Sequence, residues 1–327
     1  MKSMRILMVV IMTAVSITAF GQTMDEVIAK FNEAAESVNK GEYPTAINEF
    51  NDVLAMGETV GSEADDLMSK AKEQLPLLHY QVAISYMKQK DYENAIPYLE
   101  RTIDLSRKYE NNDEYRQKAM RYLPQLITGV GTGYYKKGDY ERALELFTDA
   151  VKYAPNYPKA YLGKGLVHMK EYDEDEMISS LTTAITMAKQ QGDDKTVKDA
   201  QEALGSYYVD MGKMEMADMD PAAEDFTYAL EAFEKAVEYD PDNTDALYNL
   251  AAIHNKMVEY DKAIEYGKRA LENADTDVKI AAIQYELGNS YFNTAQYDLA
   301  CEAFNNAMVG PFEEMAIKRK EKVPGCN

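Results

Sequence analysis

The segment Tyr134–Ala160, YYKKGDYERALELFTDAVKYAPNYPKA, contains two helical patterns joined by a tight turn. The first pattern ends at Lys137, and Gly138 follows it. Glycine adopts the left-handed conformation that ends a helix without steric cost, so we expect the helix to end here. Asp139 is suited to cap the next helix. That helix carries three residues at the spacing of one helical face, Ala143, Phe147 and Ala150. The segment therefore predicts an antiparallel pair of helices.

The same unit recurs along the chain. Small residues occupy the first-helix position of seven units: Ala34, Ala83, Gly131, Gly165, Gly205, Ala251 and Gly288. Twelve residues after six of these come Ala46, Ala95, Ala143, Met177, Ala263 and Ala300, while the fifth unit is interrupted. A large apolar residue then follows in most units: Phe50, Leu99, Phe147, Leu181, Phe233 and Phe304. Unrelated helices have no reason to share such a spacing across a loop, so the pattern predicts a repeat array.

This pattern resembles the tetratricopeptide repeat family over about Asp25–Met308, and Ala154–Asn156 and Asp240–Asn243 match the turn that ends a unit in that family. Met177 and Gly267 depart from it. The resemblance implies an all-α fold, a right-handed α-solenoid of about seven antiparallel helix pairs. It also implies that the first helix of each pair, the A helix, lines a concave groove. Such arrays bind protein segments far more often than they catalyse reactions.

The spacing of the units predicts how the chain is organised. We expect the solenoid to span residues 22–309, with an insertion of about 12 residues over Lys213–Glu224. The first two steps between small residues are 14 or 15 residues longer than the third, and the extra residues favour helix, so we expect lengthened helices there. Residues 310–327 are expected to form a capping helix and tail, because a solenoid needs a polar end.

Residues 1–21 are typical of a secretory signal peptide. Lys2 and Arg5 precede a short apolar run that ends in small residues, so we expect cleavage before Gln22. An uncleaved anchor is the alternative, which the shortness of the run disfavours. We therefore expect an exported protein of the periplasm or outer cell envelope of a Gram-negative bacterium, with no transmembrane segment in the mature chain.

The chain of 327 residues has a formal net charge of −21. Nucleic-acid binding is disfavoured, because contacts to phosphate need a basic surface. No nucleophile motif, glycine-rich phosphate loop or metal-ligand pair of histidines appears, so we expect neither catalysis nor a cofactor. The start of a calcium loop at Asp240–Asp245 lacks the required glycine and final glutamate, and the three histidines, His79, His168 and His254, are expected to pack.

The resemblance places a stripe of each A helix in the groove. The partner-binding residues predicted in this way are Tyr80, Ile84, Met87, Tyr135, Leu162, Leu166, Met169, Tyr248, Tyr285 and Phe292. Lysines stand beside the stripe at Lys88, Lys136, Lys170 and Lys256. An apolar, tyrosine-lined groove suits an amphipathic or extended partner segment.

The sequence therefore predicts a non-catalytic scaffold for protein–protein interaction, with no metal. One alternative is a ligand- or copper-handling protein, because thioethers bind Cu(I) and residues 211–219 hold Met211, Met214, Met216 and Met219. Another is an accessory subunit of an envelope enzyme complex. The pairing of the two cysteines, Cys301 and Cys326, stays open at this point.

Overall fold

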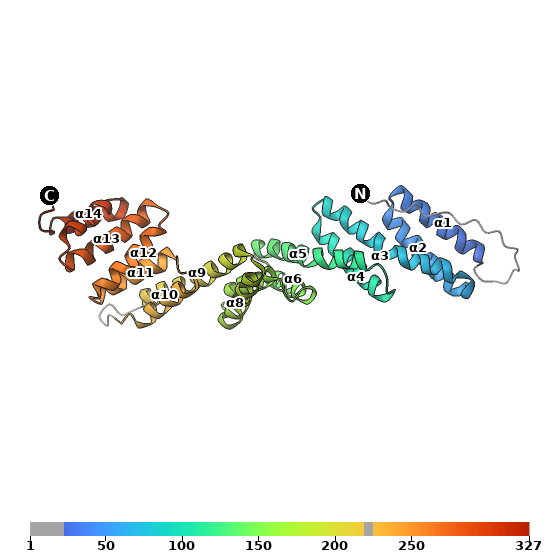
Figure 1. Ribbon diagram of the computed structural model, residues 1–327, viewed down its shortest axis with the longest axis horizontal. Coiled ribbons are helices and arrows are strands. Elements are labelled where there is room, and N and C mark those ends of the chain that lie inside the picture. Colours follow the sequence, from blue (N-terminus) through green and yellow to red (C-terminus); the bar gives the residue numbers. More distant parts are fainter. Residues whose placement is uncertain (1–22, 219–224, 327) are drawn as a thin grey trace. The chain divides into compact units, whose positions relative to one another are not determined.

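The computed structural model describes residues 23–218 and 225–326, and every regular element within them is helical (Figure 1). The chain divides into two compact units, residues 1–167 and 168–327, and the division falls inside α7. Each unit has its own hydrophobic core. The predicted signal segment 1–21 lies outside the described residues. None of the helices within the described ranges combines the length and apolar composition needed to cross a bilayer.

Unit 1 is a succession of helix pairs, in which each helix packs mainly on its neighbours in the chain. A helices also contact the A helix of the next pair: α1 contacts α3, and α3 contacts α5. Its elements are α1 (Met24–Lys40), α2 (Tyr43–Val60), η1 (Ser62–Ala64), α3 (Asp65–Lys88), α4 (Tyr92–Lys108), α5 (Asp113–Lys137), α6 (Tyr140–Tyr153) and the first part of α7 (Pro158–Glu171).

Unit 2 continues the pattern, and α9 contacts α11 as α11 contacts α13. Its further elements are α8 (Glu174–Gln191), α9 (Asp194–Asp218), α10 (Thr227–Tyr239), α11 (Thr244–Lys256), α12 (Tyr260–Glu272), α13 (Asp277–Asn293), α14 (Tyr297–Asn306), η2 (Gly310–Phe312) and α15 (Glu313–Lys320). The predicted all-α fold of stacked helix pairs is confirmed.

The seam residues found in the sequence form the cores of the pairs. The small A-helix residues are all buried, and the large apolar residues of the second helices, the B helices, are at most 2% exposed. Phe304 lies against Gly288, because a Cβ placed on that glycine would come within 2.6 Å of the ring. Small residues on the A helix thus let the B-helix ring fill the space between the two helices.

The turn between the helices of a pair ends the A helix in the left-handed region. Gly138 has φ +83°, and its N–H donates to carbonyl oxygens of the last helical turn. Asp139 then caps α6, accepting a hydrogen bond from the Arg142 N–H at 3.2 Å. The same turn position is left-handed in six pairs, at Gly41, Lys90, Gly138, Tyr172, Val258 and Ala295. Four of these are not glycine and carry a steric cost.

The long helix α3 contains a proline, and a side chain from another element replaces the missing N–H group. Pro76 lies inside α3 and cannot donate to the Lys72 carbonyl oxygen. Asn111 donates its side-chain amide to that oxygen at 3.2 Å, from the link between α4 and α5. Asn112 donates to the Glu73 carbonyl oxygen. The lengthened helices that the sequence predicts are thereby tied to one another at the α4–α5 link.

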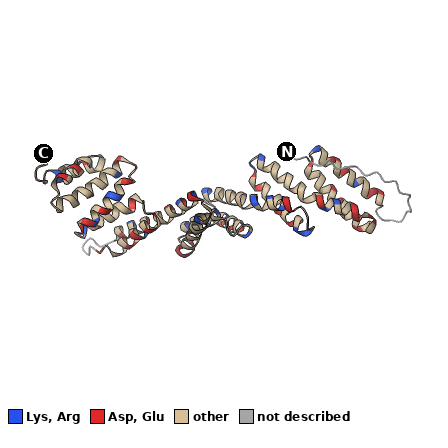
Figure 2. Ribbon diagram, viewed as in Figure 1, with Lys and Arg blue, Asp and Glu red and all other residues tan. Residues whose placement is uncertain are grey.

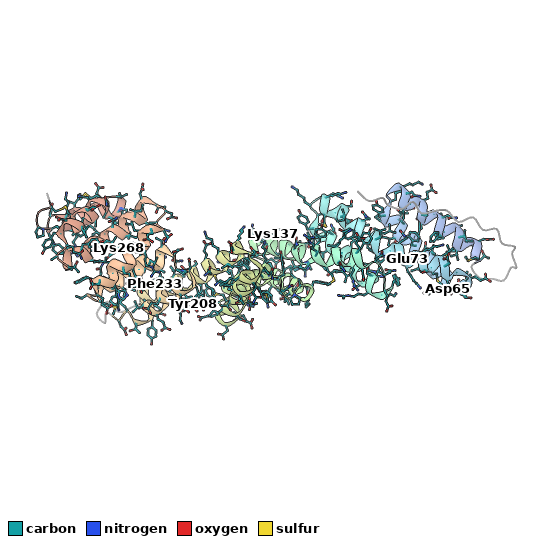
Figure 3. The ribbon with its side chains drawn as sticks, viewed as in Figure 1. Asp65, Glu73, Lys137, Tyr208, Phe233 and Lys268 are labelled. Atoms are coloured by element: carbon teal, nitrogen blue, oxygen red, sulfur yellow. A yellow bond between two sulfur atoms is a disulfide. The ribbon has the colours of Figure 1, made fainter. Side chains whose placement is uncertain are left out.

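The fifth pair corrects the predicted register. Helix α9 continues to Asp218, so the insertion does not begin at Lys213, and residues 219–224 lie outside the described part. A Cβ on Gly212 would lie 2.8 Å from the Phe233 ring, whereas one on Gly205 would meet Asp240 of a later turn. Gly212 therefore occupies the small A-helix position opposite Phe233, which Figure 3 labels. The prediction that Gly205 holds that position was wrong.

The C-terminal segment covers the last pair. Helix α15 packs on α14, and the Phe312 ring lies 6.1 Å from that of Tyr285. Val323 is 4% exposed and belongs to the core around Leu287. A disulfide joins Cys301 of α14 to Cys326, with the two Cα atoms 5.6 Å apart.

Candidate functional site

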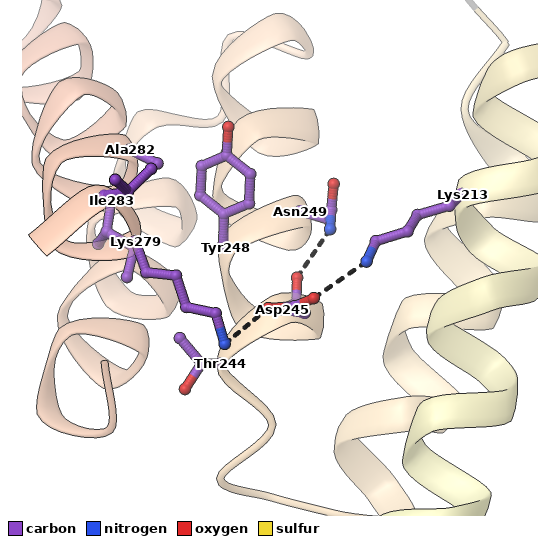
Figure 4. A pocket seen from close by; sticks show the side chains of 9 residues that line it. Lys213, Thr244, Asp245, Tyr248, Asn249, Lys279, Ala282 and Ile283 are labelled. Carbon is purple, nitrogen blue, oxygen red and sulfur yellow. Dashed lines mark hydrogen bonds and ion pairs between the residues drawn. The ribbon is translucent and has the colours of Figure 1, made fainter. Parts of the chain in front are cut away.

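A cavity of about 280 Å³ opens on the A helices of unit 2, between α11 and α13 and beside α9 (Figure 4). Apolar side chains supply most of its lining, and polar groups gather along one wall. The residues that line it are Lys213, Thr244, Asp245, Tyr248, Asn249, Val278, Lys279, Ala282 and Ile283. We call this hollow the A-face cavity. Three successive repeats contribute to it, so its shape depends on how they stack.

Asp245 is the centre of the polar wall. Its carboxylate lies 3.0 Å from the Lys213 Nζ and 3.4 Å from the Lys279 Nζ, so it links α9, α11 and α13 (Figure 4). Lys279 also pairs with Asp275 at 3.3 Å. Burial alone would raise the pKa of Asp245, but the hydrogen bond and charge of Lys213, with those of Lys279, hold it below the ordinary value. Asp245 is therefore ionised at neutral pH.

The apolar part of the cavity is built from α11 and α13. Ile283 and Ala282 are buried, Tyr248 is half-buried, and Val278 is 48% exposed. Burial raises the pKa of Tyr248, and the charge of Glu286 adds to the effect. The phenol is therefore neutral at physiological pH, and its ring offers a partly exposed apolar surface with a polar tip.

A second polar cluster lies further along the same two helices. Asn255 of α11 donates its amide to the Glu286 carboxylate at 2.8 Å, and Ser290 donates to the Asn255 side-chain oxygen at 2.6 Å. Burial raises the pKa of Glu286, although the hydrogen bonds from Asn255 and Asn289 oppose this shift. These hydrogen bonds join α11 to α13.

The site residues predicted in unit 1 differ widely in exposure. Tyr80 is only 8% exposed, and its ring lies 5.4 Å from that of Tyr115, so it offers little surface to a partner. Tyr135 is half-buried and packs on Tyr140. Four further apolar residues, Ile84, Met87, Leu162 and Leu166, are half-buried, and Lys88 and Lys136 are exposed. Their role in binding stays a prediction.

In unit 2 the cavity contains one predicted residue, Tyr248. The Tyr285 ring packs on Phe304 and Phe312, and Phe292 lies 6.1 Å from Tyr297. The Lys256 Nζ lies 5.3 Å above the Phe226 ring. Met169 is half-buried and Lys170 is exposed. The structure therefore places Tyr285 with the C-terminal segment and not in the cavity.

The charged residues of the cavity were not among the predicted ones. Lys213 falls in the predicted insertion, and Lys279 precedes the predicted stripe of α13. The spacing of these residues in the sequence could have indicated them. Lys213, Asp245 and Lys279 follow one another at intervals of 32 and 34 residues, about one repeat length. Opposite charges one repeat apart indicate ion pairs between neighbouring A helices.

The methionines and histidines singled out in the sequence differ in their surroundings. Met211 and Met216 pack against the core shared by α9 and α10, Met214 is 64% exposed, and Met219 lies outside the described residues. His254 donates from Nδ1 to the Glu259 carboxylate at 2.8 Å, and its ring stacks on Tyr266. Within residues 23–218 and 225–326 no group of three or more His, Cys, Asp or Glu side chains is arranged to hold a metal ion.

Family models match three stretches of the chain. Models described as tetratricopeptide repeat match residues 78–109 and 222–278, and one described as TPR repeat matches residues 131–171. These stretches include the whole of the A helices α7 and α11.

Curated relatives match over part of their length. The chain is 36% identical over 88 residues to the Hsp70-Hsp90 organising protein of Plasmodium falciparum (isolate 3D7), a match that covers 26% of this chain and 16% of the relative. It is 35% identical over 92 residues to the Protein STIP1 homolog of Dictyostelium discoideum, covering 27% of this chain and 16% of that protein. The chain thus spans a small part of these relatives.

Solved structures are similar to the chain as well. MamA is 23% identical, with a TM-score of 0.37, and the match covers 62% of this chain and 96% of MamA. YrrB, described as a TPR protein with an unusual peptide-binding site, is 19% identical with a TM-score of 0.31, over 60% of this chain and 91% of YrrB.

Proposed function

Since the chain belongs to the tetratricopeptide repeat family, we propose that it is a non-catalytic scaffold that binds a segment of a partner protein on its A-helix face. The observation that carries this proposal is the A-face cavity on α9, α11 and α13. A cavity with an apolar floor and a few polar groups on one wall is the usual form of a recognition site.

The chemistry of the cavity favours a peptide side chain as its occupant. Tyr248 and Val278 keep apolar surface in contact with water, and covering it is favourable by roughly 25 cal/mol per Å². A volume of about 280 Å³ is at the small end for ligand sites, which suits one or two side chains of a longer segment. The relative named an organising protein for Hsp70 and Hsp90 is consistent with a scaffold role.

We place this scaffold in the periplasm or cell envelope. Two observations support that location: the positively charged, then apolar start of the chain, and the disulfide between Cys301 and Cys326. Disulfides form and persist in oxidising compartments and are rare in the cytosol. Mass spectrometry of cell fractions tests the location. Recovery of the chain in the cytosol with both thiols reduced would contradict it.

Site-specific photo-crosslinking tests the binding face. A photoreactive phenylalanine analogue at Tyr248 should capture a discrete partner in intact cells, and the partner should be identifiable by mass spectrometry. The matched control places the same analogue at Tyr228 of α10, which is 68% exposed and belongs to a B helix. Capture of the same partner from Tyr228 but not from Tyr248 would move the binding face to the B helices.

A further inference from the structure

The negative charge of the chain is concentrated in unit 2. Residues 23–167 contain 18 basic and 23 acidic side chains, a net charge of −5, whereas residues 168–327 contain 15 basic and 33 acidic, a net charge of −18 (Figure 2). The A-face cavity belongs to this strongly acidic unit. A field of this sign attracts positively charged partners and slows the approach of negative ones.

The charge next to the cavity has the same sign. A second hollow of about 270 Å³ adjoins it and shares Lys213, Thr244, Asp245 and Lys279 with it. Three further carboxylates line this hollow, from Asp210, Asp240 and Asp242. The two hollows together therefore combine an apolar floor with a rim of four carboxylates and two ammonium groups.

The two lysines of the rim are already paired. Lys213 and Lys279 both contact Asp245, and Lys279 also contacts Asp275. By contrast, no ion pair within the described residues involves Asp210, Asp240 or Asp242. In the described part of the chain the carboxylates of Asp240 and Asp242 accept amide hydrogen bonds, from Asn243 at 3.1 Å and Asn273 at 3.5 Å.

A further cation lies at this turn without forming an ion pair with these carboxylates. Arg269 reaches the same turn, but its guanidinium donates to the Pro241 carbonyl oxygen at 3.1 Å. Asp210 and Asp242 are exposed, so an incoming ammonium or guanidinium group can reach them without any change in the fold. The rim thus has unpaired negative charge directly beside an apolar cavity.

We propose that the A-face cavity docks a basic segment of a partner protein, in which an apolar side chain fills the cavity and a neighbouring lysine or arginine pairs with Asp210 and Asp242. This inference rests on the proposed function, because it names the chemistry of the partner at the same site. An acidic segment is the less favoured occupant, because it would have to displace Asp245 from Lys213 or Lys279 and approach against the field of unit 2.

Selection from random peptides tests the charge of the occupant. The purified protein is used to select a phage library of random 12-residue peptides at low ionic strength, and peptides that no longer bind Tyr248→Ala are sequenced. We expect an apolar residue flanked by lysine or arginine to be enriched among them. Enrichment of aspartate or glutamate, or no bias in charge, would overturn the inference while leaving the proposed function in place. If no selected peptide depends on Tyr248, the proposed binding face itself fails.

A charge-matched pair of variants then tests the rim. Asp210→Asn combined with Asp242→Asn removes two negative charges at the rim, and Glu234→Gln combined with Glu238→Gln removes two from exposed positions of α10. For a selected basic peptide, fluorescence anisotropy should show affinity about three- to tenfold weaker for the rim variant. The difference should shrink as salt increases, because exposed charges are screened. Equal affinities of the two variants at low salt would overturn the assignment of the rim.

Discussion

The Phe147 ring is held between two glycines of neighbouring A helices, which makes the seam of unit 1 testable. The side chain is 2% exposed. A Cβ built on Gly131 of α5 would lie 3.0 Å from the ring, and one built on Gly163 of α7 would lie 2.5 Å from it. Gly129, two residues from Gly131 on the same helix, is exposed and would meet nothing within 4 Å. These three glycines therefore differ in packing alone.

The expected effects of alanine at the three positions follow from these distances. Replacing glycine by alanine inside a helix contributes about 1 kcal/mol through helix propensity. Gly129→Ala should therefore raise the free energy of unfolding by roughly that amount. Carbon atoms pack at about 3.5–4.0 Å, so Gly163→Ala forces a movement of roughly 1 Å in a buried ring. Overpacking of this kind costs about 1–3 kcal/mol, and Gly131→Ala should fall between the other two.

Urea unfolding followed by circular dichroism at 222 nm measures these differences. The double variant Phe147→Leu with Gly163→Ala checks the mechanism, because a smaller side chain makes room for the added methyl group. The two changes should therefore couple favourably, by about 0.5–3 kcal/mol. If Gly163→Ala were as stable as Gly129→Ala, or if the double variant showed no coupling, the ring would not occupy the space between the two helices.

Three shorter predictions concern stability. Burial, and then the charge of Arg101, lower the pKa of His79 to about 4. Between this value and the ordinary pKa of 6.5 the unfolded chain binds more protons than the folded chain, so the free energy of unfolding decreases as the pH is lowered. After reduction for the exposed part of the ring, the loss between pH 7 and 4 should be about 2 kcal/mol, and urea titrations should show it diminished in His79→Leu. Asn111→Ala should cost about 1–2 kcal/mol by leaving the Lys72 carbonyl oxygen unpaired, whereas exposed Gln117→Ala should be near neutral. Equal melting temperatures would argue against a stabilising role of the Asn111 hydrogen bond. Val258 is 66% exposed and has φ +64°, so Val258→Gly should raise the free energy of unfolding by about 1 kcal/mol. An unchanged or lower melting temperature would show that the turn is not strained.

The sequence was sufficient to predict the fold because each repeat carries the same constraint. A close approach between two helices requires a small residue on one and a large apolar residue on the other, and twelve- and four-residue spacings repeat this requirement along the chain. Ala34 with Phe50 and Gly288 with Phe304 are read directly from such spacings, and all four are buried. The turn between α5 and α6 could also be predicted, because it contains Gly138 and Asp139.

The candidate site was harder to predict, because its residues depend on register and on neighbouring repeats. Gly205 and Gly212 both fit the small position of α9, and only the contact with Phe233 distinguishes them. Choosing Gly205 shifted the expected groove face by seven residues and left Lys213 in a loop. Tyr248 was predicted because its own repeat is regular.

The register of α9 also explains why charge and apolar surface meet in one place. With Gly212 opposite Phe233, the following residue, Lys213, reaches Asp245 on the next A helix. Asp245 in turn reaches Lys279 one repeat later, so a single carboxylate holds two cations. The same step brings Asp210, one helical turn before Lys213, to the edge of the hollow with no cation of its own. The lysines of the rim are paired with Asp245, whereas its outer carboxylates are unpaired within the described residues. A basic partner can therefore form ion pairs with the rim directly. An acidic partner could do so only by breaking the ion pairs of Asp245.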